Sequence, residues 1–162
     1  MFDRSLIAKM ADRYSLPPAI VEAVIQVESA GNPWAIRHEP AFYDRYVKGK
    51  GHKVQSPCSR DTEERARAMS FGLMQVMGQT AREEGFSGTY IAELCDPAVG
   101  IEFGCKHLAT HASRFPAPRY GWDAVCAAYN GGAGAVHGPG SYRNPEYPSK
   151  ILRLLGGKWP AR

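Results

Sequence analysis

Residues 20–33, with the sequence IVEAVIQVESAGNP, decide how the N-terminal part of the chain is expected to fold. The apolar residues that open this stretch repeat at helical spacing, and Glu28 lies one turn beyond Val24. Gly31 and Pro33 are typical of a helix C-terminus followed by a residue that cannot continue the helix. The stretch therefore predicts an amphipathic helix that carries Glu28 in its last turn.

A carboxylate in that position is a candidate general acid. Partial burial and the negative end of the helix dipole both disfavour its charged form, so we expect a raised pKa for Glu28. A raised pKa is what a general acid requires near neutral pH. Taken alone, the same pattern also fits an ordinary solvated glutamate at a helix end.

Length and composition fit one domain with a single core over residues 1–162, because 44% of the 162 residues are hydrophobic. The four cysteines form no CxxC pair and do not cluster with histidines, so neither a metal site nor a cofactor is predicted. Free thiols packed as small apolar residues are expected, and one bridge from Cys58 to a helix cysteine stays open. These cysteines are Cys58, Cys95, Cys105 and Cys126.

The net charge of +4 suits an acidic polymer surface such as a bacterial envelope. No Lys/Arg run with interleaved aromatic residues is present, so nucleic-acid binding is not expected. Residues 1–9 lack the apolar core of a signal peptide, and no apolar stretch is long enough to cross a bilayer. We therefore expect a monomer that is made in the cytoplasm without a signal peptide and does not insert stably into a membrane.

Helical periodicity runs through nearly the whole chain and predicts an all-α fold, or at most an α-dominated α+β fold. Residues 32–60 are expected to be irregular, with at most a few strand residues between 42 and 55, and loops of that length are usually functional or mobile. Asp61-Thr62-Glu63-Glu64 resembles a capping box. Helices are expected over residues 5–14, 17–30, 61–69, 77–84, 96–115, 122–131 and 148–155.

Three later motifs carry candidate chemistry. Ser70-Phe71-Gly72-Leu73-Met74-Gln75-Val76 joins a glycine that permits close backbone approach to an amide that donates and accepts hydrogen bonds. Ala127-Ala128-Tyr129-Asn130-Gly131-Gly132 places an aromatic ring and an amide at a helix end, an arrangement that often grips N-acetyl sugars. Tyr147, within Glu146-Tyr147-Pro148-Ser149-Lys150-Ile151, presents its hydroxyl at the start of the last helix. Each motif alone also fits a buried turn or an ordinary core position.

The chain resembles the soluble lytic transglycosylases and, more loosely, the goose-type lysozymes in four segments that occur in the same order. These segments are Glu28-Ser29, Gly72-Leu73-Met74-Gln75, Ala128-Tyr129-Asn130 and a tyrosine before Lys-Ile. The resemblance runs from about residue 20 to residue 155. It implies a lysozyme-like fold whose cleft binds peptidoglycan glycan strands. It also implies cleavage of the β-1,4 bond between N-acetylmuramic acid and N-acetylglucosamine.

By the same resemblance, Glu28 would protonate the leaving oxygen and then act as a base. The substrate-binding residues implied are Ser29, Ser70, Gly72, Met74, Gln75, Tyr129, Asn130 and Tyr147. Most glycosidases use two carboxylates. A transglycosylase manages with one, because the substrate's N-acetyl group assists and its muramyl 6-hydroxyl then attacks to give a 1,6-anhydro product. A leaderless catalytic domain of this kind suggests a phage endolysin or another wall-penetrating, bacteriolytic factor that reaches the periplasm after release or delivery.

One departure from the family pattern keeps hydrolysis open. Gly72 follows Ser29 by 43 positions, and the inserted stretch contains Glu39 and Asp61, either of which could hold a water as a second carboxylate. The alternative function is then a goose-type muramidase. His38 is interpreted as a surface or substrate-edge residue, with no partner pattern that suggests a metal. A non-catalytic glycan-binding domain is the third reading, against which the intact Glu28 argues.

Overall fold

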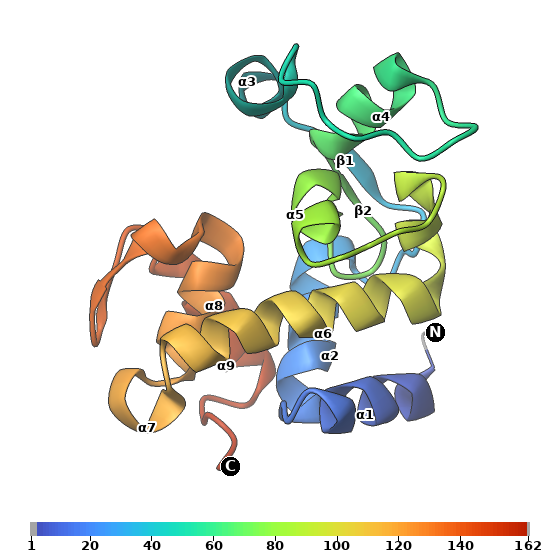
Figure 1. Ribbon diagram of the computed structural model, residues 1–162. Helices are drawn as coiled ribbons and strands as arrows, with labels where there is room; N and C mark the ends of the chain where they lie inside the picture. The colour runs from blue at the N-terminus through green and yellow to red at the C-terminus, as the bar shows by residue number, and fades with distance from the viewer. Residues whose placement is uncertain (1–2, 162) are drawn as a thin grey trace. The chain divides into compact units, whose positions relative to one another are not determined.

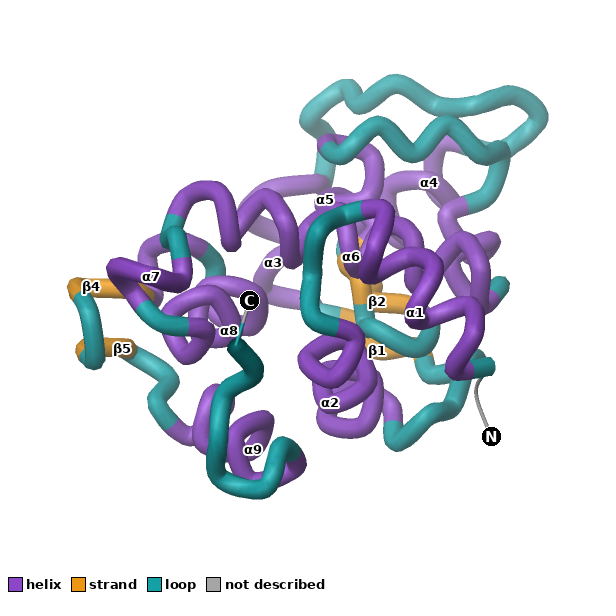
Figure 2. The backbone as a smooth tube through the Cα atoms, turned by 90° about the horizontal axis from the view of Figure 1, so that it is seen from below, coloured by secondary structure: helices purple, strands orange, loops and turns teal. Residues whose placement is uncertain are grey.

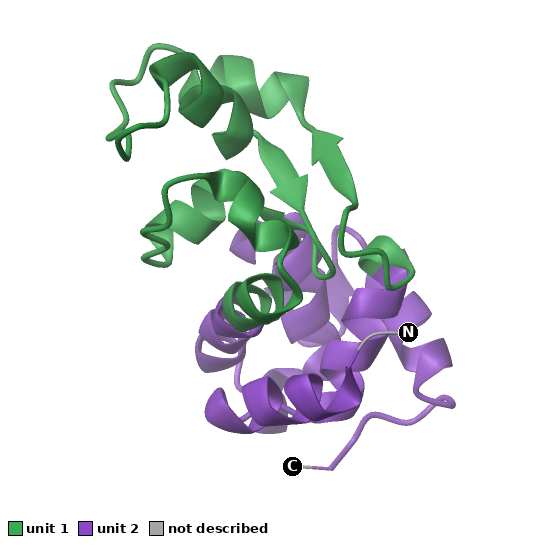
Figure 3. Cartoon of the chain, turned by 90° about the vertical axis from the view of Figure 1, so that its right-hand side faces the viewer, with its two compact units in different colours: residues 1–2, 28–104 green, residues 3–27, 105–162 purple. Residues whose placement is uncertain are grey.

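The computed structural model describes residues 3–161, and their elements group into two compact units (Figure 3). Unit 1 covers residues 28–104, and unit 2 comprises residues 3–27 together with the part of the chain from residue 105 onward. Two helices, α2 (Pro18–Ser29) and α6 (Pro97–Arg114), contribute residues to both units.

Unit 1 is built around a three-stranded antiparallel sheet of very short strands, drawn in orange in Figure 2. The strands β1 (Ile36–His38), β2 (Met69–Phe71) and β3 (Val76–Met77) follow one another in the order of the chain. Phe71 pairs with Ile36 on one side and with Val76 on the other. The four residues 72–75 therefore form the loop of the β2–β3 hairpin.

Helical segments surround this sheet. The inserted stretch contains α3 (Pro40–Phe42) and the π-helix η1 (Tyr43–Val47), and it is followed by α4 (Arg60–Arg67). The helices α4 and α5 (Gly78–Glu83) pack beside the strands (Figure 1). The 3-10 helix η2 (Ile91–Cys95) leads into α6. Leu73, Met74, Ile91, Leu94 and Ile101 are among the fully buried side chains of this unit.

Unit 2 is mainly helical. It contains α1 (Arg4–Arg13), most of α2, the second half of α6, α7 (Ala117–Tyr120), α8 (Trp122–Gly131) and α9 (Glu146–Leu154). The helices α8 and α9 pack directly on each other (Figure 1). Between them lie the 3-10 helix η3 (Ala133–Ala135) and a small hairpin of β4 (Val136–Gly138) and β5 (Ser141–Tyr142). The buried side chains of unit 2 include Ile7, Ile20, Ile25, Leu108 and Ile151.

The sequence-based helices are confirmed with small shifts, because their apolar periodicity and helix-stop residues coincide. The prediction for residues 32–60 was wrong in detail, since strand β1 lies at 36–38 rather than within 42–55 and residues 40–47 are helical. The capping box at Asp61 was also wrong. Ser59 caps α4, because its Oγ accepts a hydrogen bond from the Thr62 backbone N–H at 3.2 Å.

Within residues 3–161, none of the helices has both the length and the apolar character that crossing a bilayer demands.

Candidate active site

Glu28 lies in the last turn of α2, as the sequence predicts. The helix ends at Ser29, and the next two residues, Ala30 and Gly31, adopt left-handed conformations with φ of 51° and 81°. Such residues are common where a helix terminates. The side chain of Glu28 is half-buried. The last helical turn thus presents a partly shielded carboxylate at the negative end of the helix dipole.

Ser29 ties this helix end to the Gly72–Gln75 turn within unit 1. Its hydroxyl donates a hydrogen bond to the Leu73 carbonyl oxygen at 2.8 Å and accepts one from the Gly31 N–H at 3.2 Å. The residue next to Glu28 is therefore anchored across 44 positions of sequence. The two motifs that the sequence analysis singled out separately are joined by this contact.

Gln75 holds that turn from inside. Its Nε2 donates to the carbonyl oxygens of Ala35 at 2.9 Å and Gly72 at 3.0 Å, and its Oε1 accepts from the Ser70 hydroxyl at 3.0 Å. Its backbone has a positive φ of 49°, which is uncommon for a residue with a side chain. Both amide protons are used within the protein, so the structure gives Gln75 the role of a brace between the turn and the residue preceding β1.

Gly72 and Met74 fill space rather than face solvent. Gly72 has φ of +72°, and a Cβ placed on it would lie 2.3 Å from the Leu94 carbonyl oxygen. Met74 is fully buried, and a Cβ on Gly104 would lie 2.4 Å from its sulfur. Ser70 is buried as well. These three predicted substrate-binding residues therefore set the shape of the turn, and any part in glycan binding remains a prediction.

Both candidates for a second carboxylate have arginine partners. Glu39 accepts from Arg37 Nε at 2.6 Å, and Asp61 accepts from Arg65 Nε at 3.1 Å through both of its oxygens. The Asp61 side chain is 73% exposed, and the hydrogen bond to it raises the pKa of Arg65. An exposed, paired carboxylate of this kind is typical of a solvated surface. His38 is exposed on β1, as the sequence analysis expected.

A buried ion-pair cluster supports unit 1. Both oxygens of Glu63, which is completely buried, accept hydrogen bonds from Arg82 at 2.8 Å. Arg67 Nε lies 3.0 Å from Glu63 Oε1 but off the hydrogen-bond direction, so that contact is an ion pair alone. Burial lowers the pKa of Arg67, which Glu63 partly opposes. The cluster fixes α4 to α5, and Arg67 also reaches the inserted stretch by donating to the Lys53 carbonyl oxygen at 3.0 Å.

In unit 2, Tyr129 and Asn130 lie at the end of α8, where the sequence places them. Tyr129 is half-buried and Asn130 is exposed. Asn144 connects this end to the last helix: its Nδ2 donates to Asn130 Oδ1 at 2.9 Å and to the Ala127 carbonyl at 3.1 Å. The backbone carbonyl oxygen of Asn144 accepts from the Tyr147 N–H at 3.1 Å. Asn144 was not predicted as a site residue, because it belongs to no recognisable sequence motif.

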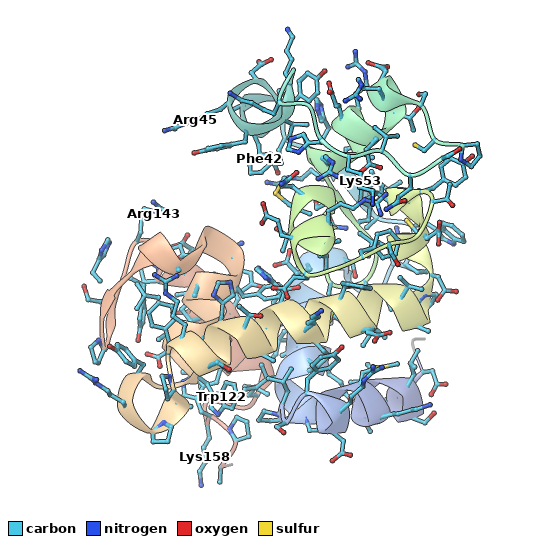
Figure 4. All side chains as sticks on the ribbon, in the orientation of Figure 1. Phe42, Arg45, Lys53, Trp122, Arg143 and Lys158 are labelled. Carbon is cyan, nitrogen blue, oxygen red and sulfur yellow. The ribbon has the colours of Figure 1, made fainter. Side chains whose placement is uncertain are left out.

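Tyr147 is the second residue of α9 and is 5% exposed. The helix begins two residues earlier than the predicted start at Pro148. Arg143, labelled in Figure 4, steadies the same region by donating from Nη2 to the Gly131 carbonyl oxygen at 2.8 Å. Asn130 and Tyr147, far apart in sequence, are thus linked through Asn144 in one hydrogen-bonded corner of unit 2.

All four cysteines are free, and burial raises the pKa of Cys95, Cys105 and Cys126. The thiols of these three residues are therefore protonated at neutral pH and behave as small apolar groups. Among the residues that the structure describes, no three or more His, Cys, Asp or Glu side chains gather as a metal-ion ligand set.

A family model described as the Transglycosylase SLT domain matches residues 5–151. The chain belongs to this family. The match covers both units and includes Glu28 and all three of the later motifs. The helix-dominated lysozyme-like fold expected from the resemblance is confirmed.

Relatives of known type agree with this membership. The membrane-bound lytic murein transglycosylase C of Actinobacillus pleuropneumoniae (serotype 5b) is 31% identical over 144 residues, which cover 81% of this chain and 31% of that protein. The protein of the same description from Salmonella typhimurium is 29% identical over 141 residues, with the same coverage. The chain therefore spans about a third of the length of these relatives.

Two solved structures share the fold. The lytic transglycosylase Slt of Pseudomonas aeruginosa, determined as an inactive glutamate-to-glutamine mutant, superimposes with a TM-score of 0.64 at 19% identity, covering 99% of this chain and 25% of that one. The 70 kDa soluble lytic transglycosylase of Escherichia coli gives 0.52 at 22% identity, covering 94% and 18%. At these identities the likeness supports the fold alone.

Proposed function

We propose that this chain is a catalytic domain, extending over residues 1–162, that cleaves peptidoglycan as a lytic transglycosylase. One observation carries the proposal: Glu28 lies at the end of α2, and the neighbouring Ser29 anchors that end to the Gly72–Gln75 turn. A general acid has to be held at a fixed position relative to the bond it protonates. Membership of the SLT family supports peptidoglycan as the substrate.

In the proposed reaction, Glu28 donates its proton to the oxygen that leaves with N-acetylglucosamine while the muramyl C1–O bond breaks. The substrate's N-acetyl group assists at C1. The muramyl 6-hydroxyl oxygen then bonds to C1 and returns its proton to Glu28, so that the enzyme ends in its starting state. The products are a new N-acetylglucosamine terminus and a 1,6-anhydromuramic terminus, and no water is consumed.

The arrangement of unit 1 favours this chemistry over hydrolysis. An inverting hydrolase needs a second carboxylate that is free to hold a water. Glu39 and Asp61, the two candidates, are each bonded to an arginine. We therefore assign them to the surface electrostatics of the inserted stretch. We assign contact with the sugar to the exposed Asn130 and the half-buried Tyr129, with Tyr147 supporting the site from the start of α9.

The proposal extends to where the chain works. A domain of this activity acts on the bacterial cell wall and needs no cofactor, and we infer that it functions there as a monomer. A phage-encoded or secreted wall-penetrating factor fits these properties. We do not expect the chain to bind nucleic acid, because its net charge of +4 is modest.

The test is the release of soluble fragments from purified peptidoglycan by the parent and by Glu28→Gln. The substitution keeps the size of the side chain and removes the acidic proton, and general acid–base catalysis typically contributes about 100-fold to 10,000-fold. We expect a loss of that size with an unchanged melting temperature. Asp61→Asn is the matched control, since it also neutralises a carboxylate, and it should keep parental activity. Equal activity in Glu28→Gln and the parent would remove the catalytic assignment.

A further inference from the structure

Two histidines that the glycan site does not use lie side by side on α6. His107 and His111 are four positions apart, and their Nε2 atoms are 3.2 Å from each other. The ring centroids are 4.5 Å apart, with the planes at 74°. Side chains four residues apart share one face of a helix, so both rings are held by a rigid element.

The hydrogen bonding of this pair defines its protonation. His111 is 6% exposed, and its Nδ1 is buried with no hydrogen-bond partner among the described residues. An unpaired acceptor costs less than an unpaired N–H donor in such a place, so His111 carries its proton on Nε2 and donates it to His107. Burial first, then His107 and Arg114, lower the pKa of His111 to about 4.

We propose that His107 and His111 form a two-histidine site for a divalent late transition-metal ion, namely Co²⁺, Ni²⁺, Cu²⁺ or Zn²⁺. Neutral imidazole nitrogens are the ligands that these ions prefer. A metal about 2.0–2.1 Å from each nitrogen, the usual metal–imidazole length, subtends an N–metal–N angle of about 100° when the nitrogens are 3.2 Å apart. That angle lies between the ideal values for octahedral and tetrahedral coordination.

The site would be completed by solvent rather than by a third protein side chain. No group of three or more potential ligands occurs in the described part of the chain. His107 is half-exposed, which gives an ion a path from solvent to the pair. Metal entry releases no proton: the His111 proton moves from Nε2 to Nδ1, so that both Nε2 lone pairs bind the metal, and coordination has to outweigh the cost of a buried, unpaired Nδ1–H. The site is not expected to bind Mg²⁺ or Ca²⁺, because these ions require oxygen donors.

The site also has a connection to the glycan motif. The His107 ring packs against the Tyr129 ring at 5.4 Å between centroids, with the planes at 53°. A metal that fixes the His107 ring would restrict Tyr129, the aromatic residue assigned to sugar contact. Metal occupancy should therefore slow glycan cleavage, and this consequence rests on the proposed function.

Isothermal titration calorimetry with Ni²⁺ tests the site independently of activity. The full chain carries Cys58→Ser, because Cys58 is the one described cysteine that is not buried and a thiol would bind the metal as well. We expect one Ni²⁺ per chain, tighter binding of Cu²⁺ than of Ni²⁺, and no heat of binding with Mg²⁺. His107→Gln should weaken Ni²⁺ at least about tenfold. His137→Gln, which removes an exposed histidine of the same unit, is the matched control and should bind as the parent does.

The result is decisive in either direction. His107→Gln changes a half-exposed side chain, so it should fold, which its melting temperature verifies. Ni²⁺ affinity that is the same in His107→Gln and in the parent would overturn the site, as would an absence of stoichiometric binding to the parent. In the activity assay, Ni²⁺ should inhibit the parent and spare His107→Gln. Binding without inhibition would overturn the coupling to Tyr129, and inactivity of the parent without metal would instead count against the proposed function.

Discussion

The turn at Gly72–Gln75 in unit 1 and the helix end at Tyr129–Asn130 in unit 2 are both family motifs, but the protein uses them differently. In the turn, Met74 is fully buried and the amide of Gln75 is consumed by internal hydrogen bonds. At the helix end, Asn130 is exposed and its carbonyl oxygen accepts one internal hydrogen bond. We therefore propose that the first motif supports Glu28 and that the second contacts the ligand. Three substitutions separate these roles, and a pH titration tests the burial of His111 in unit 2.

The largest effect is expected from Gly72→Ala. The new methyl group would lie 2.3 Å from the Leu94 carbonyl oxygen, and the positive φ adds strain, so we expect a loss of about 4 kcal/mol in the free energy of unfolding. Gly156→Ala is the control, because Gly156 has the same φ, +72°, at a helix C-terminus, with no atom within 4 Å of the added methyl group. It should cost only about 1 kcal/mol in urea unfolding. Equal losses would mean that the turn is not tightly packed.

The second effect is the pH dependence of stability that His111 gives unit 2. Its pKa is about 4 in the folded protein and near 6.5 when unfolded, so the unfolded chain takes up a proton first as the pH falls. Stability from this residue is complete above about pH 6.5 and is lost between there and pH 4, by up to about 3 kcal/mol. Urea unfolding at a series of pH values measures this loss. His111→Gln should flatten the curve and His137→Gln should not; a curve that is the same in both would contradict the assignment.

Gln75→Ala should come third. It removes three side-chain hydrogen bonds, although the carbonyl oxygens of Ala35 and Gly72 keep the backbone N–H groups that they also accept from. We expect about 2 kcal/mol of destabilisation together with weaker glycan cleavage. Ser70→Ala, which removes one of the three bonds, should cost less. If Gln75→Ala lowered activity at unchanged stability, Gln75 would be a ligand contact rather than a brace.

The smallest effect on stability is expected from Asn130→Ala. The side chain is exposed and gives up one hydrogen bond, so the loss should stay below about 0.5 kcal/mol. Cleavage of peptidoglycan should nevertheless fall about tenfold, since a lost hydrogen bond to substrate is worth roughly 1.4 kcal/mol. A stability loss as large as that of Gln75→Ala would erase the distinction between the two motifs.

The helices could be predicted from the sequence, because the apolar periodicity and the terminating residues indicate the same bounds. Glu28, for example, is placed by Val24 one turn earlier and by Gly31 after it. The strands were missed because two or three residues, as in β3 (Val76–Met77), are too short for alternation to appear. Ser59 was not predicted as the N-cap of α4, because the acidic residues that follow it suggested a capping box beginning at Asp61.

The candidate site also contains residues that could be predicted from the sequence and contacts that could not. Glu28, Gln75 and Tyr129 belong to local motifs, so their positions could be predicted. Asn144 joins Asn130 to the start of α9 only after the chain has folded, and nothing near it in sequence announces that contact. The spacing of His107 and His111 was visible as four positions on one helix, but their 3.2 Å contact depends on rotamers that only the structure fixes.

The central claim is that Glu28 works without a second carboxylate, so that the substrate's own hydroxyl completes the reaction. Mass spectrometry of the fragments released from purified peptidoglycan tests this most directly. We predict fragments that end in 1,6-anhydromuramic acid, each lighter by one water than the product of hydrolysis. Fragments that end in reducing muramic acid would contradict the account and point to a hydrolytic muramidase.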